Sequence, residues 1–187
     1  MNEMARIVPL RAESQKARIT TAQFLRMCDA GVFDDDDWKI ELVEGELERM
    51  PPPQGVHSLL QGAIYAKLLQ VFGAERTRVE IGIALTDGTV FGCDVAVMQA
   101  PLSQDRWPRA EEVLLAVEVS QTTLARDLGM KGPHYAAAGI GHYWVVDGAA
   151  SVVHAFHEPV GARFSRSQII RFGEPLNVPG SEATIML

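Results

Sequence analysis

The chain has 187 residues, of which 47% are hydrophobic and 22% charged, the balance of a globular protein long enough to bury a sizeable core. Its two cysteines, Cys28 and Cys93, exclude a disulfide framework, and no apolar run approaches the roughly 20 residues that cross a bilayer. The formal net charge of −7 argues against a tight non-specific nucleic-acid binder, because such proteins usually carry a basic excess. We therefore expect a soluble cytoplasmic protein without a secretory signal.

The N-terminal part begins with a segment that shows no periodicity. We expect residues 1–18 to be a flexible leader and residues 19–187 to form a single domain. Thr20 or Thr21 can cap a short helix that runs through Met27. The aspartate run at 34–37 lacks the spaced ligands of a calcium loop and predicts a solvated turn.

A hairpin and a long helix are expected next. Apolar and charged residues alternate over WKIELVEGELERM around Glu44-Gly45, which predicts a β-hairpin. After Pro51-Pro52-Pro53, the spacing of the apolar residues becomes that of a helix from His57 to Phe72, with Gly73 as the C-terminal cap.

The remaining segments alternate between strands and one helix. RVEIGIAL and TVFGCDVAVM predict a second hairpin, and the apolar run VLLAVEVS predicts a central buried strand. A helical stretch is expected from Thr123 to Ala138, followed by the strand pair HYWVVD and SVVHAF and by two short strands from Phe164 onward. This order predicts a mixed β-sheet flanked by helices in an α/β domain.

Two acidic residues stand inside otherwise apolar strands. Glu118 lies within VLLAVEVS and Asp94 within GCDVAVM, where an unpaired carboxylate would cost several kcal/mol. A shared hard cation such as Mg²⁺ or Mn²⁺ would remove that cost, because such ions bind one or two carboxylates and keep several waters. The alternative is that each carboxylate caps a strand or pairs with Arg or Lys.

Lys131 follows Glu118 on the next helical stretch, one turn beyond Asp127. An ammonium beside a metal-bound water can orient the nucleophile and stabilise charge during phosphoryl transfer. The alternative is an exposed helical Asp127–Lys131 pair, which contributes only a few tenths of a kcal/mol.

Several blocks, taken together and in order, resemble a known family. The sequences IELVEGELERMPPPQGVH, GCDVAVM, LLAVEVSQTT, RDLGMKGPHYAAAGIGHYWVVD and EPLNVPG are similar to those of the Uma-two (Uma2) family of restriction-endonuclease-like proteins in the PD-(D/E)xK nuclease superfamily. The resemblance runs from about Ile19 to the C-terminus.

The resemblance implies a restriction-endonuclease-like fold and a set of site residues. Asp94 and Glu118 would hold the metal, and the lysine role of the motif would move to Lys131 because Ser120 stands in the usual lysine position. The residues that would support the site are Glu41, Glu46 and His57, and two further matches are Asp127 and Tyr135.

The sequence also departs from the family pattern. Cys93 replaces the proline before Asp94, and His142 stands where the family commonly has Glu. Gly132-Pro133 interrupts the helix that carries Lys131, because proline lacks an N–H and disfavours helical geometry at the residue before it.

The leading hypothesis is thus a Mg²⁺-dependent endonuclease that hydrolyses DNA phosphodiester bonds, with a homodimer as a further expectation. The alternative is a catalytically silent nuclease-fold module with a binding or regulatory role, which Pro133 and the acidic net charge favour. A two-carboxylate glycosidase lacks an aromatic sugar platform beside Asp94 and Glu118.

Overall fold

The computed structural model describes residues 16–34, 38–52, 55–102 and 106–187. Most of the expected leader, part of the aspartate run and Pro53 lie outside these ranges. In the part described, no helix is long and apolar enough to cross a membrane.

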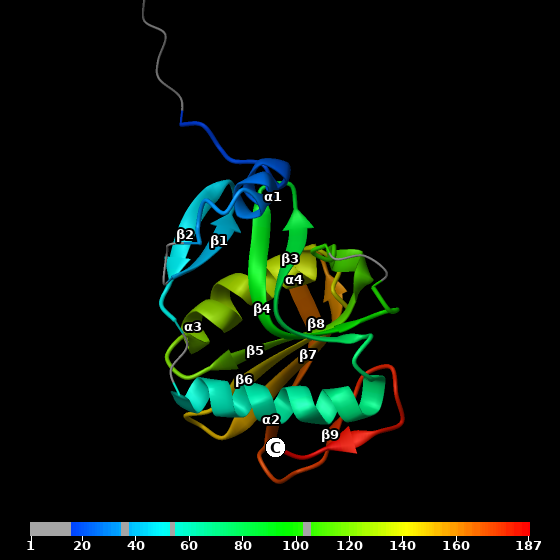
Figure 1. The fold of residues 1–187 in the computed structure, drawn as a ribbon. Helices are drawn as coiled ribbons and strands as arrows, with labels where there is room; N and C mark the ends of the chain where they lie inside the picture. Colours follow the sequence, from blue (N-terminus) through cyan, green and yellow to red (C-terminus); the bar gives the residue numbers. More distant parts are fainter. Residues whose placement is uncertain (1–15, 35–37, 53–54, 103–105) are drawn as a thin grey trace, which may run out of the picture.

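The strands in the described residues form one mixed main sheet and a separate two-stranded sheet (Figure 1). The main sheet has the strand order β2-β1-β4-β5-β6-β7-β8, with β3 paired to β4. Its strands are β1 Lys39–Val43, β2 Glu46–Met50, β3 Thr77–Thr86, β4 Thr89–Met98, β5 Val113–Ser120, β6 His142–Asp147, β7 Val152–Val160 and β8 Arg163–Arg171. The pair β5–β6 is parallel and the other pairs are antiparallel. The two-stranded sheet consists of β9 Leu176–Asn177 and β10 Thr184–Ile185.

Helices cover both faces of the main sheet (Figure 1). Their bounds are α1 Thr21–Asp29, α2 Gly55–Phe72, the short η1 Ala110–Glu112, α3 Leu124–Arg126, the wide helical turn η2 Asp127–Lys131 and α4 Gly132–Ala137. Thr20 caps α1 in a capping box with Gln23, and Gly73 follows α2 with a φ of 76°, a left-handed conformation that favours glycine.

Two hydrophobic clusters fix α2 and α4 against the main sheet. On one face, Ile64 and Leu68 of α2 pack against Val95 and Val117. On the other face, Tyr135 of α4 packs with buried side chains that include Phe91. Because both faces are covered, β5 is buried along almost its whole length and apolar except at Glu118 and Ser120, as the sequence predicts.

The segment after β7 differs from the sequence-based expectation. Two short strands, β9 and β10, are present in the tail as expected, but they follow a nine-residue strand, Arg163–Arg171, at the edge of the main sheet. Its side chains are mostly exposed, so the hydrophobic alternation that marks a half-buried strand is weak there. The strand is defined by its pairing with β7.

Candidate active site at a fork in the sheet

The candidate site lies at a fork in the sheet, where β1 and β5 pair with different parts of the same edge of β4. Along its other edge, β4 pairs with β3. Along this edge, Val90 pairs with Leu42 of β1, whereas Val95 to Met98 pair with β5. Neither ladder includes the β4 residues between these two points, so their backbone groups on this edge need other hydrogen-bond partners.

Charged side chains take the place of the missing ladder bonds. The Gly92 N–H donates to Glu41 Oε1 at 3.0 Å, and Lys131 Nζ donates to the Gly92 carbonyl at 2.9 Å. On the β5 side, the Val119 N–H donates to Asp94 Oδ2 at 2.7 Å. The fork therefore requires polar side chains at buried positions of the sheet.

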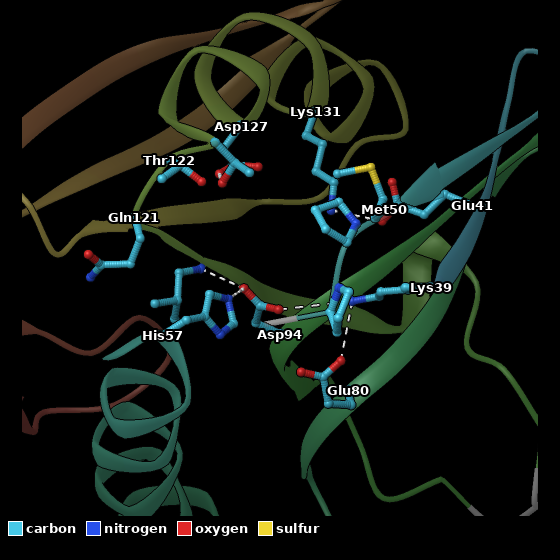
Figure 2. A pocket seen from close by; sticks show the side chains of 14 residues that line it. Lys39, Glu41, Met50, His57, Glu80, Asp94, Gln121, Thr122, Asp127 and Lys131 are labelled. Carbon is cyan, nitrogen blue, oxygen red and sulfur yellow. Dashed lines mark hydrogen bonds and ion pairs between the residues drawn. The ribbon is translucent and has the colours of Figure 1, made fainter. Parts of the chain in front are cut away.

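A cavity of about 150 Å³ opens at this fork, and Figure 2 shows the side chains around it. Strands β1, β3 and β4, the start of α2, the loop after β5 and the turn η2 all contribute to its wall. Its polar lining residues are Lys39, Glu41, His57, Glu80, Asp94, Gln121, Thr122, Thr123, Asp127 and Lys131.

Asp94 occupies the centre of the lining. Besides the Val119 N–H, its Oδ2 atom is 3.1 Å from His57 Nε2, and its Oδ1 atom is 3.9 Å from Lys39 Nζ (Figure 2). Burial favours a neutral carboxyl, but the His57 hydrogen bond and the positive charge of Lys39 outweigh it and lower the pKa of Asp94. Asp94 is therefore ionised and available as an anionic oxygen ligand.

Glu118 lies behind the cavity wall and is 3% exposed. Its Oε1 atom accepts hydrogen bonds from Lys131 Nζ at 2.9 Å and from the Tyr135 hydroxyl at 2.6 Å. Burial raises the pKa of Glu118 to about 8, and the nearby charge of Asp94 adds to the rise although Lys131 opposes it.

Lys131 connects three elements at the fork. Its Nζ atom lies within 3.0 Å of three oxygens, those of Gly92, Glu118 and Glu41. Burial alone would lower the pKa of Lys131, but the negative charges of Glu118 and Glu41 raise it. The ammonium is thus charged and directed at the strands.

A wide helical turn brings Lys131 to this position. The sequence predicts an interrupted helix at Gly132-Pro133, whereas α3, η2 and α4 follow one another without a break. In η2 the Gly132 N–H bonds to the Asp127 carbonyl, five residues back, and Pro133 stands in the first turn of α4, where its missing N–H is tolerated. Such π-turns occur often at functional sites.

Asp127 begins this turn and faces the cavity. Its Oδ2 atom accepts a hydrogen bond of 2.7 Å from the Thr123 hydroxyl, and burial raises the pKa of Asp127. Arg126, the preceding residue, forms ion pairs with Glu41 at 2.7 Å and Glu48 at 2.6 Å. These contacts hold the β1–β2 hairpin against the helical segment.

His57 lies in the first turn of α2 and reaches Asp94. The hydrogen bond to Asp94 raises the pKa of His57, and within the described residues its Nδ1 atom is buried without a hydrogen-bond partner. One turn later, Gln61 donates to the Asp94 carbonyl at 3.1 Å and also to Glu80. The N-terminal part of α2 therefore fixes Asp94 from one side.

The sequence-predicted residues do not all meet at the fork. Asp94, Glu118, Lys131, Glu41 and His57 do, but Glu46 does not. The Glu46 side chain is exposed at the start of β2 and is absent from the cavity lining among the described residues. The β1–β2 register explains this position, because it places Glu48, not Glu46, opposite Glu41.

Two charged lining residues, Lys39 and Glu80, were not predicted from the sequence. Lys39 Nζ donates to Glu80 Oε2 at 3.2 Å. Lys39 could have been found from the strand alternation, because it shares a face of β1 with Glu41. Glu80 carried no such signal: its φ of 50° interrupts the regular pairing of β3 between Val79 and Ile81.

The donor chemistry fits a hard divalent cation. Asp94, Glu118 and Asp127 are close enough for their charges to influence one another, since Asp94 and Asp127 both raise the pKa of Glu118. A bound cation would relieve this repulsion, and Mg²⁺ or Mn²⁺ prefers carboxylate oxygens. In the described ranges, no group of three or more His, Cys, Asp or Glu residues is placed to hold an ion. Mg²⁺ commonly uses only one or two carboxylates and keeps several waters.

Comparisons with known proteins bear on the family and the fold of the chain. A family model, Uma2, described as "Putative restriction endonuclease", matches residues 21–185. The fold is similar to the crystal structure of a "putative nuclease belonging to DUF820" from Anabaena variabilis, with a TM-score of 0.63 and 20% sequence identity over 90% of this chain and 94% of that chain. The comparison with curated proteins found no match.

Proposed function

The chain belongs to the Uma2 family of restriction-endonuclease-like proteins, and from this premise we propose that it is a metal-dependent endonuclease that hydrolyses DNA phosphodiester bonds. The observation that carries the proposal is the fork itself. It gathers the carboxylates of Asp94 and Asp127 at one cavity, with Glu118 behind them, and all three residues are buried.

Asp94 and Glu118 would hold Mg²⁺ or Mn²⁺. When bound, the ion would supply Lewis-acid stabilisation of the phosphate and a water of lowered pKa. The residues of the chain would position these partners. Asp94 is fixed by the Val119 N–H and His57, and Glu118 is fixed by Lys131 and Tyr135.

Glu41, Lys131 and His57 would act through these ligands. Glu41 bridges Lys131 and Arg126, and the charge of Lys131 helps to lower the pKa of Glu41 against the effect of burial. His57 donates to Asp94 when its Nε2 atom is protonated, and it would release that oxygen to an incoming cation.

The test is cleavage of plasmid and single-stranded DNA with Mg²⁺ or Mn²⁺ by the purified protein. We expect Asp94→Asn and Glu118→Gln each to lower the cleavage rate by about 10²–10³-fold, the usual effect of removing a charge-stabilising group. Glu182→Gln is a suitable control, because Glu182 is exposed in the loop between β9 and β10.

Undiminished cleavage in both site variants would reject the assignment. If the unmodified protein binds Mn²⁺ in calorimetry but cleaves neither DNA, the silent nuclease-fold module becomes the better account.

We further propose a homodimer in the cytoplasm. Two sites are needed to cut both strands at once, and β8 is an edge strand of the described sheet that exposes Ile169. Cys28 and Cys93 are free thiols, which suits a reducing compartment. Light scattering after gel filtration tests the dimer, and a monomer at the concentration used for cleavage would refute it.

A further inference from the structure

The site contains two lysines whose hydrogen-bonding states differ. The ammonium of Lys131 has three N–H donors and three oxygens within 3.0 Å, and its side chain is 5% exposed. Lys39 is 32% exposed and lines the same cavity. Among the described residues, Lys39 Nζ donates a hydrogen bond only to Glu80 Oε2, at 3.2 Å. Asp94 Oδ1, at 3.9 Å from Nζ, is too distant for a hydrogen bond.

We infer that Lys39, rather than Lys131, provides the ammonium that contacts the scissile phosphate of the substrate. The inference rests on the proposed nuclease function and assigns the substrate contact within it. Lys131 is then a positioning residue, because its three donors are directed at Glu118, Glu41 and the Gly92 carbonyl. Lys39 retains donors that a phosphate oxygen can accept.

The backbone is shaped to let Lys39 reach the cavity. A Cβ atom on Gly92 would lie 1.9 Å from Lys39 Cε and 2.7 Å from Nζ, so the lysine chain crosses β4 at a position where a side chain is excluded. Glu80 then orients the ammonium, and Gln61 holds Glu80 from α2. Figure 2 shows Lys39 between Glu80 and Asp94, directed toward the centre of the site.

The charge balance around the cavity favours a phosphate at Lys39. The protein has a formal net charge of −7, and the basic side chain of Arg126, which contacts the hairpin, is already paired with Glu41 and Glu48. An exposed cation beside Asp94 can therefore neutralise a phosphate oxygen that approaches the proposed metal.

The experiment compares Lys39→Met, Lys39→Arg and Gly92→Ala with the unmodified protein. Gly92→Ala keeps the lysine but displaces its flexible end, and Gly62→Ala is the matched control because a Cβ there meets no atom within 4 Å. A duplex oligonucleotide in Ca²⁺ measures binding over a series of salt concentrations, and the same duplex in Mg²⁺ measures cleavage. Calorimetry with Ca²⁺ alone and thermal unfolding report on the metal site and the fold.

We expect Lys39→Met to reduce the magnitude of the slope of the logarithm of the DNA association constant against the logarithm of the salt concentration by about 0.9. That change corresponds to the loss of one phosphate contact. Its cleavage rate should fall by about a hundredfold, while its Ca²⁺ affinity and unfolding temperature stay near those of the unmodified protein. Gly92→Ala should follow Lys39→Met, and Lys39→Arg should restore the slope. Lys131→Met should keep the slope and lower the unfolding temperature.

A wild-type slope together with wild-type cleavage in Lys39→Met would overturn the inference and leave the nuclease proposal intact. Loss of Ca²⁺ binding or of folding in Lys39→Met would also overturn it, because the lysine would then be structural. If the unmodified protein neither binds nor cleaves the duplex, the proposed function fails, and the assignment of Lys39 fails with it.

Discussion

Glu118 shows how a single residue can indicate a site. An acidic residue in the middle of an apolar strand has to be compensated, and this expectation needs no knowledge of the fold. The structure supplies the compensation through the Lys131 ammonium and the Tyr135 hydroxyl, at 2.9 and 2.6 Å. Even so, burial keeps the pKa of Glu118 near 8.

The raised pKa predicts that metal binding depends on pH. Below about pH 8 Glu118 is protonated in the metal-free protein and has to lose its proton before it can bind an ion. The apparent affinity for Mn²⁺ should therefore rise by up to about tenfold per pH unit below that pKa and level off above it. Calorimetric titration between about pH 6 and about pH 8.5 measures this, and buffers of different ionisation enthalpy detect the released proton.

Glu118→Gln provides the control for this experiment. It removes the titrating group, so the remaining Mn²⁺ affinity should vary little over the same range. A steep pH dependence that persists in Glu118→Gln would assign the titration to another group.

At the scale of elements, the turn η2 connects the helical segment to the sheet. A regular helix could not contain Pro133 in its interior without losing a hydrogen bond. The wide turn places the proline in the first turn of α4 and directs Lys131 toward β4 and β5. This arrangement predicts that Lys131 contributes to stability as well as to the site.

Lys131→Met should lower the free energy of unfolding by about 3 kcal/mol, because the buried Glu118 would lose one of its two hydrogen-bond donors and the buried Glu41 one of its two cations. Urea denaturation measures the change. Combining Lys131→Met with Glu118→Leu should recover part of the loss, since a buried ion pair can often be replaced by apolar side chains. A single variant as stable as the unmodified protein would show that the three-way contact at Lys131 is not stabilising.

At the scale of the whole molecule, charge limits how the protein can bind DNA. With a formal net charge of −7, it cannot rely on general attraction to the phosphate backbone. The candidate cavity also gathers carboxylates, which repel phosphate until a cation is bound.

Binding of a duplex oligonucleotide should therefore require divalent ions. We expect affinity in Ca²⁺ to exceed affinity in EDTA by at least about tenfold at low salt, because the ion screens Asp94 and its acidic neighbours. Fluorescence anisotropy measures both states. Asp94→Asn should narrow the difference, and equal affinities in Ca²⁺ and EDTA for the unmodified protein would contradict the electrostatic argument.

The sequence by itself determined most of the elements, although not the long strand β8, and the two acidic positions. Hydrophobic periodicity depends on residues near one another in the chain, so it predicted the β1–β2 and β3–β4 hairpins, the long helix α2 and the buried strand β5. Asp94 and Glu118 were found for the same local reason, since each interrupts an apolar run.

Only the tertiary structure decided which side chains meet. The fork on β4 depends on two strands from distant parts of the chain sharing one edge, and it creates the unpaired backbone groups that Glu41, Lys131 and Asp94 satisfy. The same geometry admits Lys39 and Glu80 to the cavity and leaves Glu46 outside it. Local sequence patterns do not encode such convergence, because it is fixed by strand pairing over long separations.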